Sequence, residues 1–181
     1  MNFADSSIFK VVAYRLSSLA ISINDFDDSD IDLHGIYRVI LNLSTLKYNN
    51  LNVYSGLLSV SNAFENNKRF STIEYLTMTH SCTIDGLTCF LKYTPRLRHL
   101  TCASLNYTYD AVENDVPLIL PNLTYFWIYY CNIPFDEFQQ FIEKNFSQLH
   151  VFRIDTFSNE NYINLDRWKP LILQNIYTSI T

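Results

Sequence analysis

Glycine and basic residues are scarce in this chain, and it has no long apolar run. Only 3 of its 181 residues are glycine, so no glycine-rich loop of the kind that cradles phosphates can be written in it. The 13 Lys and Arg residues are outnumbered by 18 Asp and Glu residues, for a net charge of −5. Such a balance lacks the basic footprint that nucleic acids require. Apolar runs stop after five or six residues, well short of the roughly 20 of a membrane helix. We therefore expect a soluble protein with neither nucleic acid nor membrane as partner.

The amino-terminal sequence MNFADSSIFK lacks the positive segment and apolar stretch of a secretory signal. We therefore expect a cytoplasmic or nuclear protein whose four cysteines, Cys82, Cys89, Cys102 and Cys131, are reduced thiols. Their spacing contains no C-x-x-C pair and fits no zinc template. Buried packing is the expected role, with no metal and no cofactor.

A repeated pattern of the form L-x-x-L-x-L runs through the sequence. The clearest copy is LPNLTYFWIYYCNI, which ends in a cysteine three residues after the last apolar position. Six copies can be aligned without gaps, and they start near Leu16, Leu43, Ile73, Leu97, Leu123 and Leu149. Successive starts are 27, 30, 24, 26 and 26 residues apart, close to the 20–29-residue period of leucine-rich repeats.

The segments between the copies carry apolar residues at helical spacing, which predicts a helix after most strands. Such stripes occur at residues 36–40, 57–64, 84–91, 135–146 and 165–176, the last with Pro170 inside it, where a kink or a restart is expected. We therefore predict an α/β fold: one domain over residues 1–181, a leucine-rich-repeat solenoid of about six repeats with a curved parallel sheet inside and helices outside.

The repeat length, the closing cysteine and the phrase CTIDGLTCFLKYTPRLRHLTC resemble the cysteine-containing, ribonuclease-inhibitor-like repeats of F-box proteins. The resemblance covers residues 14–176. It implies substrate recognition for a cullin-type ubiquitin ligase, whose adaptor binds a separate F-box module. No F-box phrase is visible in residues 1–181, so this chain alone is expected to bind substrate but not the ligase adaptor. A repeat-only regulator or scaffold unconnected to ubiquitin ligases is the alternative.

Residues that suggest catalysis or metal binding have simpler explanations. The acidic run NDFDDSDID lacks the Gly and Glu of a calcium loop and is better explained as a turn that supplies a helix N-cap. His99 and Cys102 are three residues apart, so strand alternation directs them to opposite faces. We therefore expect no enzymatic activity. A thiol enzyme that uses Cys89, Cys102 and the histidines is the less favoured alternative.

The alternation of each strand also predicts a binding surface. Residues between the apolar positions should point onto the concave sheet face, which becomes aromatic toward the carboxyl-terminal copies. We predict a protein-binding site centred on Trp127, because Trp, Tyr and Arg dominate interface hot spots. Its members are Lys47, Tyr75, His99, Tyr125, Trp127, Tyr129, Arg153 and Asp155. The competing interpretation is that these side chains only pack against their sheet neighbours.

Neither end of the sequence resembles the polar cap that a solenoid needs. SSIFKVVAY precedes the first copy, and IYTSIT follows the last helical stripe. An uncapped end exposes the core of the last repeat, so we expect the isolated chain to be marginally stable or to self-associate.

Overall fold

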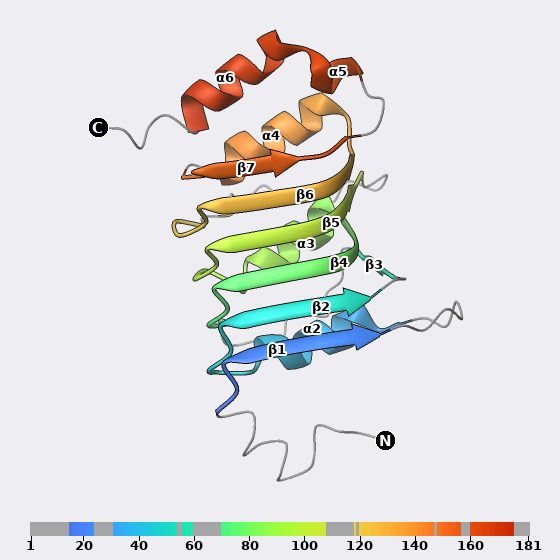
Figure 1. Cartoon of the computed structure of the whole chain (residues 1–181), viewed down its shortest axis with the longest axis vertical. Coiled ribbons are helices and arrows are strands. Elements are labelled where there is room, and N and C mark those ends of the chain that lie inside the picture. Colours follow the sequence, from blue (N-terminus) through green and yellow to red (C-terminus); the bar gives the residue numbers. More distant parts are fainter. Residues whose placement is uncertain are drawn as a thin grey trace.

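The computed structural model describes residues 15–23, 31–53, 56–59, 70–107, 118, 120–146, 148–156 and 160–175. Within these residues seven strands form one sheet, and all of their pairings are parallel (Figure 1). The strands are β1 (Ser18–Ile23), β2 (Tyr48–Val53), β3 (Leu57–Leu58), β4 (Tyr75–Thr83), β5 (His99–Asn106), β6 (Tyr125–Asn132) and β7 (Val151–Ile154). Their order is β1-β2-β4-β5-β6-β7, with β3 paired to β4. The predicted α/β class with a parallel sheet is confirmed.

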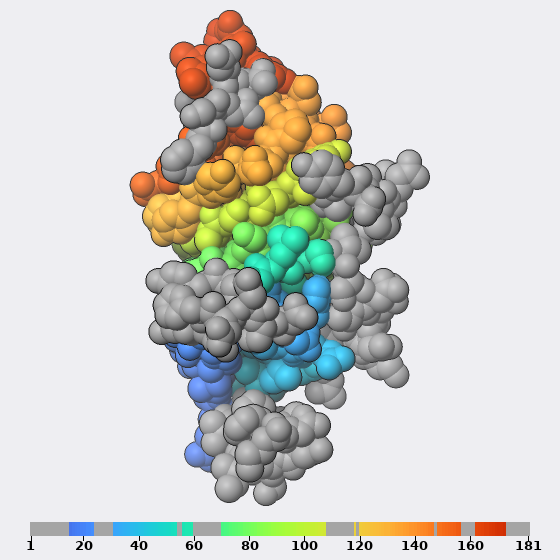
Figure 2. Space-filling view, turned by 90° about the vertical axis from the view of Figure 1, so that its right-hand side faces the viewer, coloured from blue at the N-terminus to red at the C-terminus, as the bar shows by residue number. Residues whose placement is uncertain are grey.

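Helices follow strands along the chain, as parallel pairing requires. They are α2 (Leu33–Leu41), α3 (Ile84–Leu91), α4 (Phe135–Asn145), α5 (Glu160–Ile163) and α6 (Leu165–Asn175). Helices α2, α3 and α4 lie on one face of the sheet, behind the strands in Figure 1, while α5 and α6 lie beyond β7. Figure 2 shows the segments following one another along the long axis in chain order. None of the described helices is long and apolar enough to span a membrane.

Two helices begin at side-chain caps that the sequence supplies. The Asp32 carboxylate accepts a hydrogen bond from the Gly35 amide at 2.8 Å, which caps α2. Thr83 accepts from the Gly86 amide at 3.0 Å and caps α3. The N-cap predicted from the acidic run is therefore confirmed at Asp32, whereas residues 24–30 of that run lie outside the described residues.

The predicted stripe at 57–64 is replaced at its start by a strand, because Leu57 and Leu58 pair with β4 as β3. Two residues are enough for this pairing, and a helical stripe and a short strand cannot be distinguished over so few positions. The rest of that stripe lies largely outside the described residues.

The core lies between the sheet and the helices. At one level of the sheet the register brings Ile21, Leu51, Met78, Cys102, Ile128 and Ile154 side by side on neighbouring strands. The four central members of this row are buried, at 0% exposure. The helices add Tyr37, Phe90 and Phe138, which are equally inaccessible. No strand–helix unit could bury its apolar stripe alone, so neighbouring units stabilise one another.

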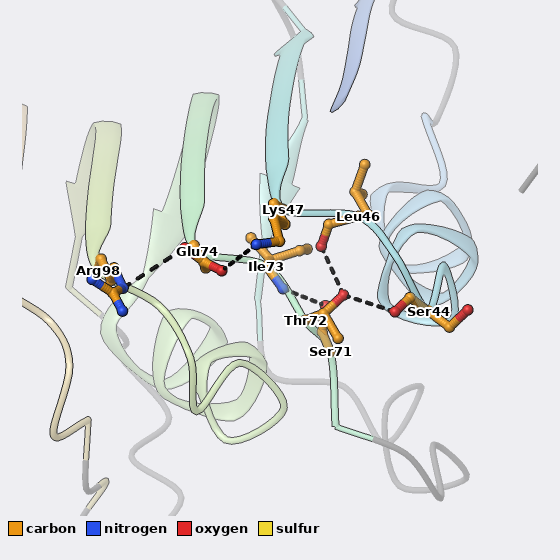
Figure 3. Close-up of polar contacts among 8 residues, drawn as sticks. All are labelled: Ser44, Leu46, Lys47, Ser71, Thr72, Ile73, Glu74 and Arg98. Carbon is orange, nitrogen blue, oxygen red and sulfur yellow. Dashed lines mark hydrogen bonds and ion pairs between the residues drawn. The ribbon is translucent and has the colours of Figure 1, made fainter. Parts of the chain in front are cut away.

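The same hydrogen-bond pattern joins the starts of neighbouring strands. The carbonyl of Lys47 accepts hydrogen bonds from the amides of Glu74 and Tyr75, both at 2.9 Å, and the carbonyls of Ser17, Glu74, Arg98 and Thr124 each accept two amides in the same way. Near the Lys47 carbonyl the Thr72 hydroxyl donates to the Leu46 carbonyl at 2.8 Å (Figure 3). These bonds hold the strand starts in step along the sheet.

The register of the second copy differs by three residues from the sequence alignment. Ser18 pairs with Tyr48, and Tyr48 pairs with Tyr75, which places Leu46 rather than Leu43 level with Leu16 and Ile73. Leu43 instead closes the turn after α2, where its amide donates to the Ile40 carbonyl at 3.1 Å. Both leucines are buried, so the apolar pattern fits either frame.

The frame was ambiguous because a polar residue occupies a core position. The frame that starts at Leu43 makes Asn49 face outward, but Asn49 is 3% exposed, and its amide donates to the Leu19 carbonyl at 3.3 Å. The same frame puts Tyr48 in the core, but Tyr48 is 47% exposed. The hydrogen bond to Leu19 satisfies the amide nitrogen of this buried asparagine, while its Oδ1 has no partner among the described residues.

The carboxyl-terminal end of the core is covered, contrary to the expectation of an uncapped end. The indole of Trp168 in α6 packs against Phe135 and Phe152, with ring centroids 5.2 and 6.2 Å apart, and donates to the Tyr162 carbonyl at 2.8 Å. The Tyr162 hydroxyl donates to the Ile133 carbonyl at 2.9 Å. Helix α6 also continues through Pro170, so the expected restart is not observed. The residues before the first copy, 1–14, lie outside the described part.

Candidate interaction face

The sheet has one face that no described helix covers, which we call the open face (Figure 1). Alternate residues of each strand point to this face, because successive side chains in a strand project in opposite directions. The predicted site residues on the strands lie at these alternate positions: Tyr75, His99, Tyr125, Trp127, Tyr129 and Arg153. Lys47 and Asp155 lie just before β2 and just after β7. The structure divides the set into three parts.

The first part is a row of stacked rings that crosses four strands, which we call the aromatic row: Tyr48, Tyr75, His99 and Tyr125. Adjacent strands align these residues in register. Their ring centroids lie 4.6, 4.6 and 5.2 Å apart along the row, with interplanar angles of 12°, 21° and 24°. Such cross-strand pairs stabilise a sheet. The aromatic row therefore fits the competing interpretation, in which these side chains support the fold.

Tyr48 is the member that the sequence analysis missed. Its neighbours Tyr75, His99 and Tyr125 were all assigned outward, so a continuous aromatic row would have been visible had the second copy been aligned at Leu46. The signal was the recurrence of an aromatic ring two residues after the first apolar position in three successive copies.

The second part is the Trp127 cluster, formed by Trp127, Tyr129 and Arg153. The rings of Trp127 and Tyr129 lie 3.9 Å apart between centroids, at an angle of 32°. The guanidinium carbon of Arg153 lies 4.2 Å from the centre of the Trp127 ring, a cation–π contact. Trp127 is half-buried, whereas Tyr129 and Arg153 are exposed. The predicted grouping of these three residues is present.

Two buried nitrogen atoms on this face, the indole Nε1 of Trp127 and the Nδ1 of His99, have no hydrogen-bond partner among the described residues. A covered polar atom without a partner destabilises the fold by about 1–3 kcal/mol. Trp127 therefore occupies its position at a cost to stability.

The third part is a line of charges at the strand starts. The Glu74 carboxylate lies 3.2 Å from the Lys47 ammonium and 3.7 Å from the Arg98 guanidinium (Figure 3). Lys47 and Arg98 thus both contact the Glu74 carboxylate. Asp155 is exposed at the far end of the open face, and its backbone extends the β6–β7 pairing through the Ile128 carbonyl at 3.0 Å and the Cys131 amide at 3.2 Å.

The residues considered for thiol chemistry, Cys102 and His99, lie on opposite faces of the sheet. Cys102 lies in the core at 0% exposure, while His99 belongs to the aromatic row on the open face. The Cys102 sulfur lies 2.9 Å from that of Cys82. This hydrogen bond, followed by burial, raises the pKa of the Cys82 thiol, and burial raises that of Cys131 to about 11. Both of these thiols stay protonated at neutral pH, whereas nucleophilic cysteines are thiolates.

Two hollows lie away from the aromatic row. One of about 220 Å³ lies between α3 and α4 and has a mixed lining that includes Asp85, Glu137 and Lys144. The other, of about 350 Å³, lies between β7 and α6 and is lined by Phe152, Arg153, Ile154, Trp168, Leu171 and Ile172. Among the described residues no group of three or more His, Cys, Asp or Glu side chains is placed to hold a metal ion.

Comparison of the chain with known protein families, curated proteins and solved structures gives no match. Its function must therefore be inferred from its own residues and their geometry.

Proposed function

We propose that this chain is a non-enzymatic protein-interaction module, built as a leucine-rich-repeat solenoid whose open face is the concave binding surface. The strands follow one another in chain order, the same hydrogen-bond pattern joins the starts of neighbouring strands, and one apolar level repeats across the sheet. Each of these features supports a stack of like units. The resemblance to F-box repeats extends the proposal to substrate recognition for a ubiquitin ligase.

The Trp127 cluster is the observation that carries this proposal. Trp, Tyr and Arg are the residue types enriched at interface hot spots, where a few side chains supply most of the binding free energy. Here one of each is packed together on a face without a covering helix among the described residues. The aromatic row beside it provides a rigid apolar surface on which a partner can lie.

The competing account, in which these rings serve only the sheet, explains the aromatic row better than the Trp127 cluster. The rings of the row stack on one another at every step. In the Trp127 cluster, by contrast, the exposed Arg153 guanidinium has no ion pair within the part of the chain that the structure describes. An exposed guanidinium with unused hydrogen-bonding capacity favours a binding role.

Site-specific photocrosslinking tests the proposal. A photoreactive phenylalanine analogue replaces Tyr129 on the open face or, as a control, Gln139 on α4, and crosslinked proteins are identified by mass spectrometry. We expect a specific partner from position 129 alone. With that partner purified, Trp127→Ala should weaken binding by about 2 kcal/mol or more, while Gln139→Ala leaves it unchanged. Binding that survives Trp127→Ala but is lost in Gln139→Ala would assign the interface to the helical side.

The identified partner also separates the two forms of the proposal. If the chain recognises ligase substrates, depleting it should lower ubiquitination of the partner and raise its abundance. A regulator or scaffold would leave both quantities unchanged. Replacing the wild-type chain with the Trp127→Ala chain should affect both quantities in the same way as depletion, because both forms of the proposal place the partner on the open face.

A further inference from the structure

We propose that the Trp127 cluster recognises an acidic peptide segment: a carboxylate side chain of the partner pairs with Arg153, and a neighbouring apolar side chain enters the hollow between β7 and α6. This inference rests on the proposed function and adds the chemistry of the partner to it.

Arg153 is a cation on the open face that has no ion pair among the described residues. Its guanidinium lies 4.2 Å above the Trp127 ring and is exposed. Lys47 and Arg98 both lie against Glu74, whereas Arg153 has no carboxylate within ion-pair distance in the described ranges. The indole under it restricts the side chain, so the guanidinium is oriented before a ligand arrives. An oriented guanidinium binds a carboxylate through two parallel hydrogen bonds.

The surroundings of Arg153 favour a carboxylate over a phosphoryl group. Sites for phosphorylated side chains use several arginines, because the ligand carries nearly two negative charges. Among the described residues of this part of the open face Arg153 supplies one guanidinium, and Asp155 follows two residues later, just after β7. The Asp155 carboxylate repels a dianion more strongly than a singly charged group. A singly charged aspartate or glutamate side chain therefore matches this position.

The hollow beside Arg153 supplies an apolar contact. It has a volume of about 350 Å³, and apart from Arg153 its lining side chains are apolar or aromatic, including Phe152, Ile154 and Ile172. Small-molecule and side-chain sites combine such apolar walls with a few polar groups that fix orientation. Because Arg153 lines the hollow and also contacts Trp127, one extended segment can reach both.

The recognition must act at short range. The chain carries a net charge of −5, so its overall field does not attract an acidic partner, and that long-range field is screened beyond about 10 Å at ordinary salt concentrations. Direct pairing with Arg153 and burial of an apolar side chain in the hollow are contact effects. They provide specificity for an acidic–apolar segment without attracting acidic proteins in general.

Selection from a random peptide library displayed on phage, with the full chain as target, tests the inference. We expect enriched peptides to carry Asp or Glu beside a large apolar residue. The best peptide and its amide counterpart, with Asp→Asn or Glu→Gln, are then measured by fluorescence anisotropy. The protein variants are Arg153→Gln, Ile172→Gln and the matched control Arg38→Gln, an exposed arginine on α2.

Arg153→Gln should weaken binding of the acidic peptide about tenfold. The amide peptide should bind the Arg153→Gln variant no more weakly than it binds the wild type. Ile172→Gln should also weaken binding, while Arg38→Gln should not. Circular dichroism and unfolding midpoints confirm that each variant is folded.

Enriched peptides without acidic residues, or equal binding by Arg153→Gln, would overturn the inference. If Trp127→Ala still abolished that binding, the proposed function would stand. A library that yields no binder also overturns the inference about the acidic peptide, because short acidic–apolar segments are abundant in such a library. Photocrosslinking at position 129 then remains the separate measure of the proposed function.

Discussion

The hydroxyl of Tyr37 lies 2.6 Å from the Nε2 of His80, and both side chains are buried. The other ring nitrogen of His80, Nδ1, lies 3.0 Å from the Ser81 carbonyl and must donate its hydrogen there. Burial lowers the pKa of His80 and so favours the neutral imidazole, in which Nε2 accepts from Tyr37. This bond joins α2 to β4, so one polar contact inside the apolar core links a helix to the centre of the sheet.

Tyr37→Phe should lower the free energy of unfolding by about 1–3 kcal/mol, because it leaves the Nε2 of His80 buried without a donor. Urea unfolding followed by circular dichroism measures the change. Tyr48→Phe is the matched control: its hydroxyl belongs to a ring that is 47% exposed, and we expect a change within about 0.5 kcal/mol. Equal stability of the two variants would mean that the buried hydrogen bond contributes nothing.

The stability of the protein should fall as the pH drops below about 6.5. Burial lowers the pKa of His80 from its ordinary value of 6.5, opposed in part by the hydrogen bond to Ser81. The unfolded chain therefore takes up a proton at a pH where the folded chain does not, and acid favours unfolding. The loss begins at the unfolded pKa and continues down to the folded one.

This pH effect is assigned to His80 by comparison with His80→Gln. The difference in unfolding free energy between about pH 7.5 and about pH 5.5 should be smaller in this variant, because Gln has no proton to gain there. A difference as large as that of the wild type would assign the pH effect to other groups.

The sequence predicted the strands well because the L-x-x-L-x-L spacing of their apolar residues differs from the spacing in helices and loops. It failed at the second copy, where Leu43 and Leu46 offer two frames three residues apart and Asn49 takes a core position. A polar residue in the core breaks the pattern from which the frame is inferred. The correct frame depends on pairing with β1 and β4, which a single segment does not contain.

For the candidate site, alternation along the strands placed Tyr75, His99, Tyr125, Trp127, Tyr129 and Arg153 on the open face but missed Tyr48, because the second copy was aligned three residues too early. It could not predict that Arg153 contacts Trp127 or that Glu74 joins Lys47 to Arg98, since these contacts depend on rotamers and on register between strands. The hollow beside β7 could not be predicted from the sequence either, because it forms only where α6 packs beside β7.

Native thiol labelling distinguishes the interaction module from the thiol-enzyme alternative. Cys82, Cys102 and Cys131 are buried, and the pKa values of the Cys82 and Cys131 thiols are raised. Iodoacetamide at neutral pH should label these three slowly in the folded protein and fast in denaturant, since only an accessible thiolate reacts. Mass spectrometry assigns each site. Fast labelling of native Cys102 would favour the enzyme instead.

Trp168→Ala should expose the carboxyl-terminal end of the core. The indole packs against Phe135, Phe138 and Phe152, and truncating a fully buried Trp costs about 3–5 kcal/mol. Because Trp168 is only half-buried, we expect a loss of about 2–3 kcal/mol in unfolding free energy. The uncovered rings should also promote self-association, measured by sedimentation velocity at increasing protein concentration. Leu165→Ala, at a side chain that is 76% exposed on the same helix, should change neither quantity. A Trp168→Ala protein as stable and as monomeric as the Leu165→Ala control would show that α6 is not the cap of this end.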